Sequence, residues 1–176
     1  MVETRARLHL NELESTLFHK ILVGIDGSPH AAAALMQAID IARAQRATLT
    51  LLTAFQPYHW YAGVGVEGII PVEFDPEVDA ALTAYSSRIL EAAAAIVPSD
   101  VGSEARVVEG RVVDTILQAV RDGDHDLIAI GSRGRGDVTS LVLGSVSHNL
   151  IHHSPVPVLL VHVPTEAAAE PAKPTP

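Results

Sequence analysis

The sequence predicts one α/β domain built on an open, mainly parallel sheet with helices on both faces. Short apolar and β-branched runs alternate along the chain with longer helix-like stretches, which is the order of repeated strand–helix units. The 176 residues are enough for one domain with a sizeable core, but not comfortably for two. Hydrophobic residues make up 48% of the chain and charged residues 19%, as is ordinary for a globular protein.

Five strands and four helices are expected. The strands are predicted at 20–26, 47–55, 104–110, 126–131 and 156–163. The helices are predicted at 28–45, 76–97, 112–123 and 144–153. Ser28 is a good N-cap residue and Pro29 follows at the first helical position, a favoured pairing at a helix start. Residues 56–75 contain glycines and aromatic residues and are expected to form a long loop.

Composition bounds the organisation and the partners of the chain. We expect an N-terminal extension at 1–18, a folded domain at 19–164 and a disordered, Pro- and Ala-rich tail at 165–176. No apolar run approaches ~20 residues, so no membrane span is expected. The net charge of −9 argues against a nucleic-acid partner. The chain lacks cysteine and an apolar signal core at its start, and we expect a cytoplasmic location.

The most informative motif is Gly-x2-Gly-x9-Gly-Ser at residues 131–145, between a predicted strand and a predicted helix. A glycine-rich turn after a strand lets backbone N–H groups face an anion without obstruction by Cβ atoms. A Gly-Ser pair that opens a helix adds further N–H groups and the positive end of the helix dipole. Two such anion sites suit a polyphosphate better than a single phosphate.

Asp26 ends the first predicted strand and is the second polar feature of interest. Parallel sheets bind ligands at the carboxyl ends of their strands, where the winding direction reverses. If the first and fourth strands are neighbours, Asp26 and the glycine-rich motif flank one crevice. Asp-Gly-Ser-Pro is also good turn chemistry by itself, so a turn or cap role for Asp26 stays open beside the binding role.

Together these features resemble the universal stress protein family, in the subgroup that binds ATP. The resemblance is carried by KILVGIDGS at 20–28, by the glycine-rich motif with its following serine at 131–147, and by HHSPVPVLLV at 152–161. It covers roughly residues 19–163. It implies a Rossmann-like fold of the adenine nucleotide α-hydrolase type, with a five-stranded parallel sheet of order 3-2-1-4-5. It also implies a homodimer formed through the last strand, 156–163.

The resemblance implies an ATP site in the crevice, with Mg²⁺ bound through the phosphates and no metal ligand from the protein. The implied nucleotide-binding residues are Gly24, Ile25, Asp26, Ala54, Ile130, Gly131, Arg133, Gly134, Gly144, Ser145, Val146 and Ser147. Asp26 would contact the ribose or adenine, and Ala54 would contact adenine through its backbone. Ile130 and Gly131 would line the ribose, and the later residues of the set would hold the phosphates.

The resemblance implies that the protein is a nucleotide-dependent regulatory or stress-response switch that acts on an unknown protein partner. It also implies that the protein is not an enzyme, apart from slow ATP hydrolysis. No P-loop lysine motif and no Gly-x-Ser-x-Gly motif occurs, which favours binding over catalysis. Residues 24–28 do not match the Ser-Gly-Gly-x-Asp-Ser loop of related pyrophosphatases. Two alternatives stay open: a non-nucleotide dimeric interaction module, and a cyclic-AMP-binding member of the same family.

Two further patterns carry less weight. Gly63, Gly65 and Gly68 spell G-x-G-x-x-G, but no predicted strand precedes them and no helix follows directly, as a dinucleotide site requires. His148 and His152 lie four residues apart on a predicted helix, but Asn149 stands where a zincin has glutamate. The other histidines are expected at the surface or at an interface.

Overall fold

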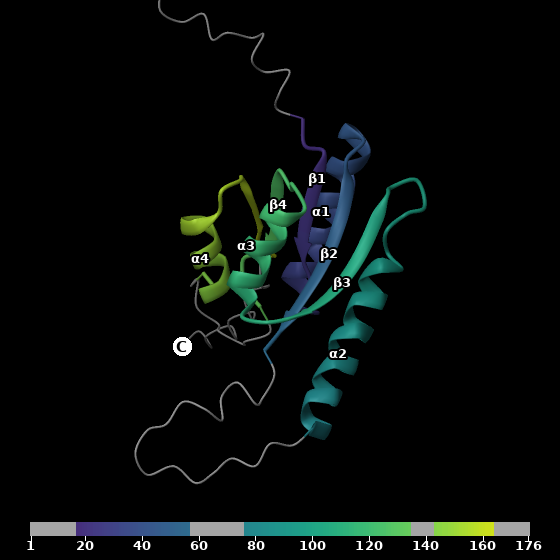
Figure 1. Cartoon of the computed structure of the whole chain (residues 1–176). Coiled ribbons are helices and arrows are strands. Elements are labelled where there is room, and N and C mark those ends of the chain that lie inside the picture. The colour runs from purple at the N-terminus through teal and green to yellow at the C-terminus, as the bar shows by residue number, and fades with distance from the viewer. Residues whose placement is uncertain (1–16, 57–75, 135–142, 164–176) are drawn as a thin grey trace, which may run out of the picture.

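The computed structural model describes residues 17–56, 76–134 and 143–163, and its elements follow the predicted order (Figure 1). The strands are β1 (Lys20–Gly24), β2 (Thr48–Phe55), β3 (Ser103–Glu109), β4 (Leu127–Gly131) and β5 (Val158–Val161). The helices are α1 (Pro29–Gln45), α2 (Pro76–Ala94), α3 (Val112–Asp122) and α4 (Ser145–His153). The G-x-G-x-x-G sequence at 63–68, the tail at 165–176 and all but the last two residues of the extension at 1–18 lie outside the described residues.

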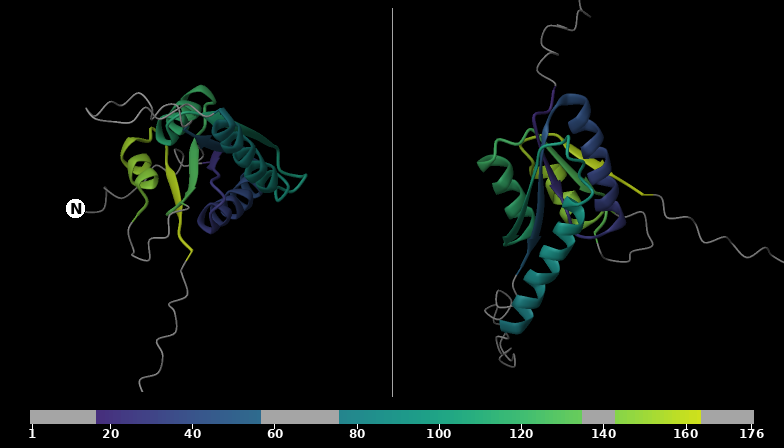
Figure 2. Two further views of the ribbon diagram at one scale, coloured as in Figure 1. Left: turned by 90° about the horizontal axis from the view of Figure 1, so that it is seen from below. Right: turned by 90° about the vertical axis from the view of Figure 1, so that its right-hand side faces the viewer.

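The sheet confirms the predicted topology. Its five strands are all parallel and lie in the order β3-β2-β1-β4-β5. Helices α1 and α2 cover one face and α3 and α4 cover the other, so the domain has three layers (Figure 2). Because β1 pairs with β2 on one side and β4 on the other, the winding direction reverses between β1 and β4. The loops that carry Asp26 and the glycine-rich motif therefore leave the sheet side by side.

Burial follows the layers. Strands β1 and β4 lie in the middle of the sheet and are almost completely buried, whereas every residue of the edge strand β5 is half-buried. Helix α1 packs on the sheet through alanines at positions 31, 34, 38 and 42, together with Leu35 and Ile39. Small side chains on this helix face allow close approach to the strands. In the described parts of the chain, no helix combines the length and apolar character needed to cross a bilayer.

Three predicted boundaries differ from the structure for identifiable reasons. Strand β1 ends at Gly24 instead of residue 26, because the backbone N–H of Ser28 donates to Oδ1 of Asp26 at 2.9 Å and closes a turn. Helix α2 ends at Ala94, and residues 96 and 97 continue it only as tighter turns, with hydrogen bonds to the third residue before them. Strand β5 spans Val158–Val161 instead of 156–163, since the prolines before it cannot donate to a sheet ladder.

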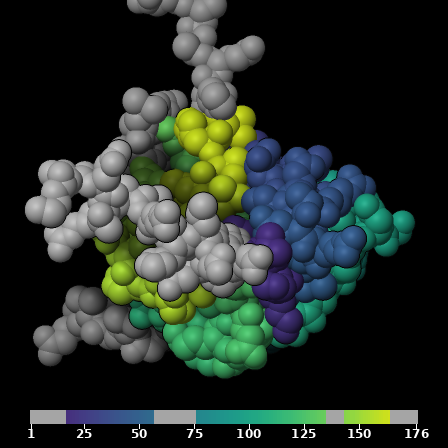
Figure 3. Space-filling model, turned by 90° about the horizontal axis from the view of Figure 1, so that it is seen from above, coloured from purple at the N-terminus to yellow at the C-terminus, as the bar shows by residue number. Residues whose placement is uncertain are grey.

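At the amino end of the sheet, a carboxylate links the starts of β1 and β4. The carboxylate of Asp126 accepts backbone N–H groups from His19 at 2.7 Å and from Lys20 at 3.1 Å. In Figure 3 the start of the described chain, in purple, lies against the green segment that leads into β4. His125, in that segment, is only 5% exposed. The expectation that the remaining histidines lie at the surface or at an interface is therefore wrong for His125.

Candidate functional site

A cavity of about 500 Å³ lies where β1, β2 and β4 end and α4 begins. All twelve residues of the predicted nucleotide site line it. Five further residues complete the lining: Ala31, Leu52, Val112, Ile116 and Leu143. The volume is within the range of ligand pockets, roughly 300–1,000 Å³. The structure thus brings the twelve predicted residues together from four separate parts of the sequence, as the resemblance implied.

The start of α4 forms the polar floor of this cavity. Gly144 is its N-cap residue and makes no side-chain cap, and the backbone N–H of Gly144 donates to the carbonyl of Ser132 at 3.0 Å. The first amides of any α-helix lack a carbonyl partner within the helix. Ser145, Val146 and Ser147 occupy those positions and line the cavity. The floor therefore offers backbone donors and the positive end of a helix dipole.

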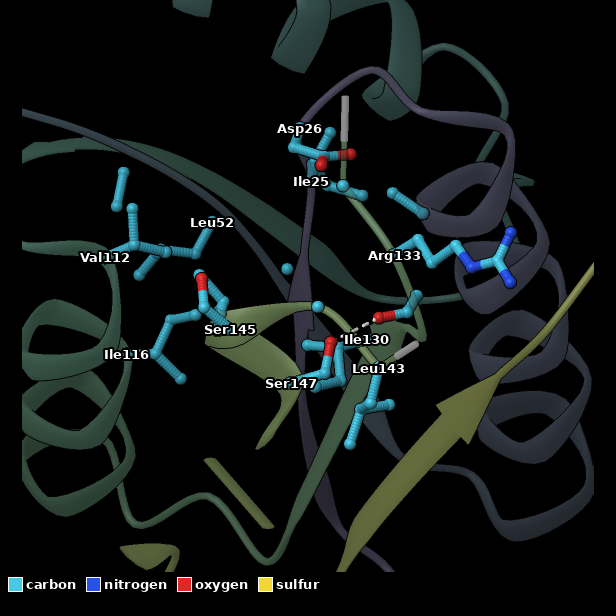
Figure 4. Close-up of a pocket in the computed structure, with 17 residues that line it drawn as sticks. Ile25, Asp26, Leu52, Val112, Ile116, Ile130, Arg133, Leu143, Ser145 and Ser147 are labelled. Atoms are coloured by element: carbon cyan, nitrogen blue, oxygen red, sulfur yellow. Dashed lines mark hydrogen bonds between the residues drawn. The ribbon is translucent and has the colours of Figure 1, made fainter. Parts of the chain in front are cut away.

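The hydroxyl of Ser147 has a structural task in addition. It donates to the carbonyl oxygen of Gly131 at 2.9 Å, and the residue is only 4% exposed. This bond joins the first turn of α4 to the end of β4 (Figure 4). Because its single hydrogen is used there, Ser147 can offer a ligand its backbone N–H but not its hydroxyl donor.

Asp26 holds the opposite side of the cavity. Its Oδ1 accepts the N–H of Ser28, while the Oγ of Ser28 accepts the N–H of Ala31 and lies 3.5 Å from the carbonyl oxygen of Arg133. The loop after β1 is thus tied both to the start of α1 and to the loop after β4. Asp26 serves as a turn residue and lines the cavity as well, so the two roles considered from the sequence coexist.

The three glycines of the motif are required for different reasons. A Cβ at Gly131 would lie 2.7 Å from backbone and side-chain atoms of His30, so glycine is needed where β4 meets α1. A Cβ at Gly134 would lie 2.9 Å from Oδ2 of Asp26. A Cβ at Gly144 would meet only ordinary contacts, the nearest at 3.5 Å. The protein therefore constrains Gly131 most and Gly144 least.

Apolar side chains form the other wall. Leu52, Val112 and Ile116 gather on one side in Figure 4, away from Asp26 and Arg133. The N–H of Ile25 donates to the carbonyl of Leu52, so the backbone groups of Leu52 face β1. Backbone groups two residues apart in a strand point to the same side. The N–H and carbonyl of Ala54 therefore point to the same side as those of Leu52, beyond the end of β1. Ala54 therefore directs one donor and one acceptor toward the cavity.

Arg133 lines the cavity, but its guanidinium points away from Ser145 (Figure 4). A contact between this guanidinium and a ligand beside Ser145 requires another side-chain rotamer. The structure thus places the arginine at the site without aiming its charge at the floor.

The residues that sequence reasoning missed are mainly apolar. Val112 and Ile116 lie four apart on α3, and Leu52 precedes Ala54 by one strand period. These spacings place them on the faces that meet the cavity, but the same spacings describe any core residue. Among the described residues, no three His, Cys, Asp or Glu side chains group as a metal site would. The rings of His148 and His152 lie 4.6 Å apart.

Comparisons with known proteins agree with this architecture. A model of the universal stress protein family matches residues 17–162. The universal stress protein in the QAH/OAS sulfhydrylase 3′ region of Thermus aquaticus is 35% identical over 147 residues, which cover 82% of this chain and 99% of the relative.

Two solved structures show the same fold. The hypothetical protein MJ0577 gives a TM-score of 0.71 at 25% identity, over 85% of this chain and 99% of that one. A universal stress protein in complex with cAMP gives a TM-score of 0.61 at 26% identity, over 84% of this chain and 98% of that one. The chain described here belongs to the universal stress protein family.

Proposed function

We propose that this protein binds ATP in the cavity and acts as a nucleotide-dependent switch in a stress response. The observation that carries the proposal is the division of one cavity into an apolar wall and a floor of backbone donors. A nucleotide has the matching division, since its base is flat and weakly polar while its phosphates are anionic. The relative solved with cAMP supports an adenine nucleotide as the ligand class.

The cavity residues suggest an orientation for the nucleotide. The base fits between Leu52, Val112 and Ile116, where the backbone of Ala54 can exchange hydrogen bonds with its edge. The phosphates fit at the start of α4, where amides and the helix dipole favour negative charge. Asp26 then lies on the ribose side. We propose that Mg²⁺ is bound through the phosphates, where it would neutralise part of their charge.

The switch follows from where the cavity connects to the rest of the domain. Ser132 lies between two cavity residues, and its N–H donates to the carbonyl of Val161 in β5 at 2.8 Å. Its hydroxyl lies 3.0 Å from Nδ1 of His162. A nucleotide that repositions this loop would therefore act on the exposed edge of the sheet. We propose that this edge, residues 156–163, forms a homodimer in the cytoplasm and that occupancy alters the surface offered to a partner protein.

Cyclic AMP is the second candidate ligand, favoured by the relative that was solved with it. ATP carries two more phosphates, which the loop at 131–134 and the start of α4 could hold together. Competition therefore separates the two: ATP should displace a fluorescent adenine nucleotide at lower concentration than cAMP does. The reverse order would assign the cavity to the cyclic nucleotide.

Purification without added ligand tests the proposal itself. Denaturation followed by chromatography should release adenine nucleotide from the protein, in an amount that falls after dialysis against EDTA. Incubation of the reloaded protein should then convert ATP to ADP slowly or not at all. If no nucleotide is released and none can be loaded, the glycine-rich motif is a structural element and the interaction-module alternative holds.

A further inference from the structure

A series of side-chain contacts links α3 to the edge strand β3 through the interior of the domain. His125 is 5% exposed and Thr50 is 6% exposed. The Nδ1 of His125 lies 3.0 Å from the carbonyl oxygen of Ala119 in α3, and its Nε2 lies 2.8 Å from Oγ1 of Thr50 in β2. The same hydroxyl lies 2.9 Å from Oε1 of Glu104 in β3. None of these residues lines the cavity at the carboxyl end.

Counting hydrogens shows that these three contacts cannot all be hydrogen bonds in the neutral state. The carbonyl of Ala119 only accepts, so Nδ1 of His125 must carry a hydrogen. The hydroxyl of Thr50 has a single hydrogen, which can serve Nε2 of His125 or the carboxylate of Glu104, but not both. All three contacts are satisfied beside an ionised Glu104 only when Nε2 also carries a hydrogen, which makes His125 an imidazolium.

The surroundings keep His125 neutral near pH 7. Burial lowers its pKa from the ordinary value of 6.5, and the cations of Lys20 from β1 and Arg106 from β3 lower it further. The Ala119 carbonyl and the Glu104 carboxylate act in the opposite direction. Hydrogen bonds from Arg106 and then from Thr50 lower the pKa of Glu104, so this carboxyl is ionised at neutral pH.

The ring of His125 has little freedom to avoid this arrangement. A Cβ at Gly123 would lie 2.6 Å from its Nδ1, so the ring packs directly over a glycine. The nearby carboxylate of Asp126 accepts the N–H groups of His19 and Lys20, and the ammonium of Lys20 donates to the carbonyl of Gly123 at 3.0 Å. The side chains of Asp126 and Lys20 thus form hydrogen bonds with backbone groups near the His125 ring.

We propose that His125, Thr50 and Glu104 form a proton switch centred on the buried pair of His125 and Thr50. Near neutral pH the Thr50 hydroxyl donates to the carboxylate of Glu104, so the contact between its oxygen and Nε2 of His125 has no hydrogen. Uptake of one proton from solvent by Nε2 of His125 supplies that hydrogen, and this N–H is the only covalent bond that forms. Acidification thereby extends the link between β2 and β3 into a continuous link from α3 through β2 to the edge strand β3.

The switch is a property of the folded domain and does not depend on the proposed ligand. It nevertheless reaches the cavity, since α3 carries Ala119 near one end and the cavity residues Val112 and Ile116 near the other. Proton uptake at the amino end of the sheet therefore ties the helix that forms the apolar wall to β2 and β3.

NMR of the full chain with ¹⁵N-labelled histidine tests the switch, with His125→Asn to assign the signals. At pH 7.5 the long-range ¹H–¹⁵N pattern should show His125 as the Nδ1–H tautomer. Titration to pH 5 should give a midpoint that Glu104→Gln and Thr50→Val each lower by roughly 0.5–1 pH unit, because the imidazolium loses a nearby negative charge in the first variant and its hydrogen-bond acceptor in the second. Thr50→Ser keeps the hydroxyl and should keep the midpoint.

Glu91→Gln is the matched control, since it removes one carboxylate from the exposed face of α2 on the other side of the sheet. Its midpoint for His125 should equal that of the wild type. An Nε2–H tautomer at pH 7.5 would overturn the proposal, because the Ala119 contact would then not be a hydrogen bond. So would a midpoint that is the same in Glu104→Gln, Thr50→Val and the control. If Thr50→Val does not fold, Glu104→Gln with its control still decides.

Discussion

The carboxyl and amino ends of the sheet bring their segments together by different means. At the carboxyl end, beside hydroxyl bonds from Ser28 and Ser147, glycines allow close backbone contacts: the N–H of Gly144 donates to Ser132, and Gly131 packs against the backbone of His30. At the amino end side chains do so, with Asp126 accepting two backbone N–H groups and His125 lying between α3 and β2. The first end should therefore be sensitive to added atoms, and the second to pH.

Gly131→Ala should give the largest effect and tests the carboxyl end directly. Its new Cβ would lie 2.7 Å from His30 and 2.8 Å from the backbone nitrogen of Ala31, so β4 or α1 must shift. We expect urea denaturation to show a loss of about 2–3 kcal/mol in the free energy of unfolding. Gly144→Ala, with its nearest contact at 3.5 Å, should lose less than about 1 kcal/mol. Equal losses in the two variants would contradict the account of the two glycines.

Gly134→Ala separates binding from folding at the same end. Its Cβ would lie 2.9 Å from the carboxylate of Asp26, which is a side chain that can move. We expect stability close to that of the wild type and ATP affinity reduced at least about tenfold, measured by calorimetric titration. Asp26→Ala should weaken the binding of ATP more than that of tripolyphosphate. Wild-type affinity in Gly134→Ala, or equal losses for both ligands in Asp26→Ala, would mean that the cavity has been assigned wrongly.

The amino end should respond to pH through His125. Its pKa is lowered in the folded protein, chiefly by burial, so below pH 6.5 the unfolded chain binds this proton more readily than the folded chain. The contribution of His125 to stability is therefore unchanged above that pH and falls as the pH falls toward the lowered value. Each unit of lowering corresponds to about 1.4 kcal/mol. Between pH 7.5 and 5, the free energy of unfolding should fall more steeply in the wild type than in His125→Asn. Parallel decreases in the two proteins would contradict this role of His125.

The exposed ion pair between Arg43 of α1 and Asp100 should give the smallest effect. The guanidinium donates to both carboxylate oxygens at 2.9 and 3.0 Å, but the side chains are 47% and 62% exposed. Solvent and salt screen such a pair, although it lowers the pKa of Asp100. Asp100→Asn should lower the thermal midpoint by less than about 2 °C, and less still in 0.5 M salt. A larger shift would show that surface pairs matter more here than the buried contacts.

The contrast between the two ends also explains what could be predicted from the sequence. The fold, Asp26 and the glycine-rich motif were accessible because glycine spacing and strand ends are local in sequence, and the parallel topology then brings them together. The full set of twelve cavity residues came from the family resemblance. The amino end is assembled from single residues far apart, since Thr50 lies 75 positions from His125 and 54 from Glu104. No local pattern marks such residues, and His125 was expected at the surface or at an interface for that reason.

The cavity lining shows the same limit. Leu52, Val112 and Ile116 look like ordinary core residues in the sequence, because the apolar period of a strand or helix is the same for a core and for a ligand wall. Ser147 was expected to hold phosphate, but its hydroxyl donates to the carbonyl of Gly131, a bond that depends on the side-chain rotamer. The orientation of Arg133 is likewise a matter of rotamer and not of sequence.

Titration of ligand-free protein with ATP and Mg²⁺, followed by calorimetry and by thermal unfolding, tests the central claim most directly. The account predicts saturable binding at one site per chain and a thermal midpoint that rises with ATP concentration as mass action requires. In Gly134→Ala both effects should need at least about tenfold more ATP, while the ligand-free variant unfolds at nearly the wild-type temperature. No heat and no rise in the midpoint at millimolar ATP, in a wild type shown to be folded and ligand-free, would contradict the assignment of the cavity to ATP.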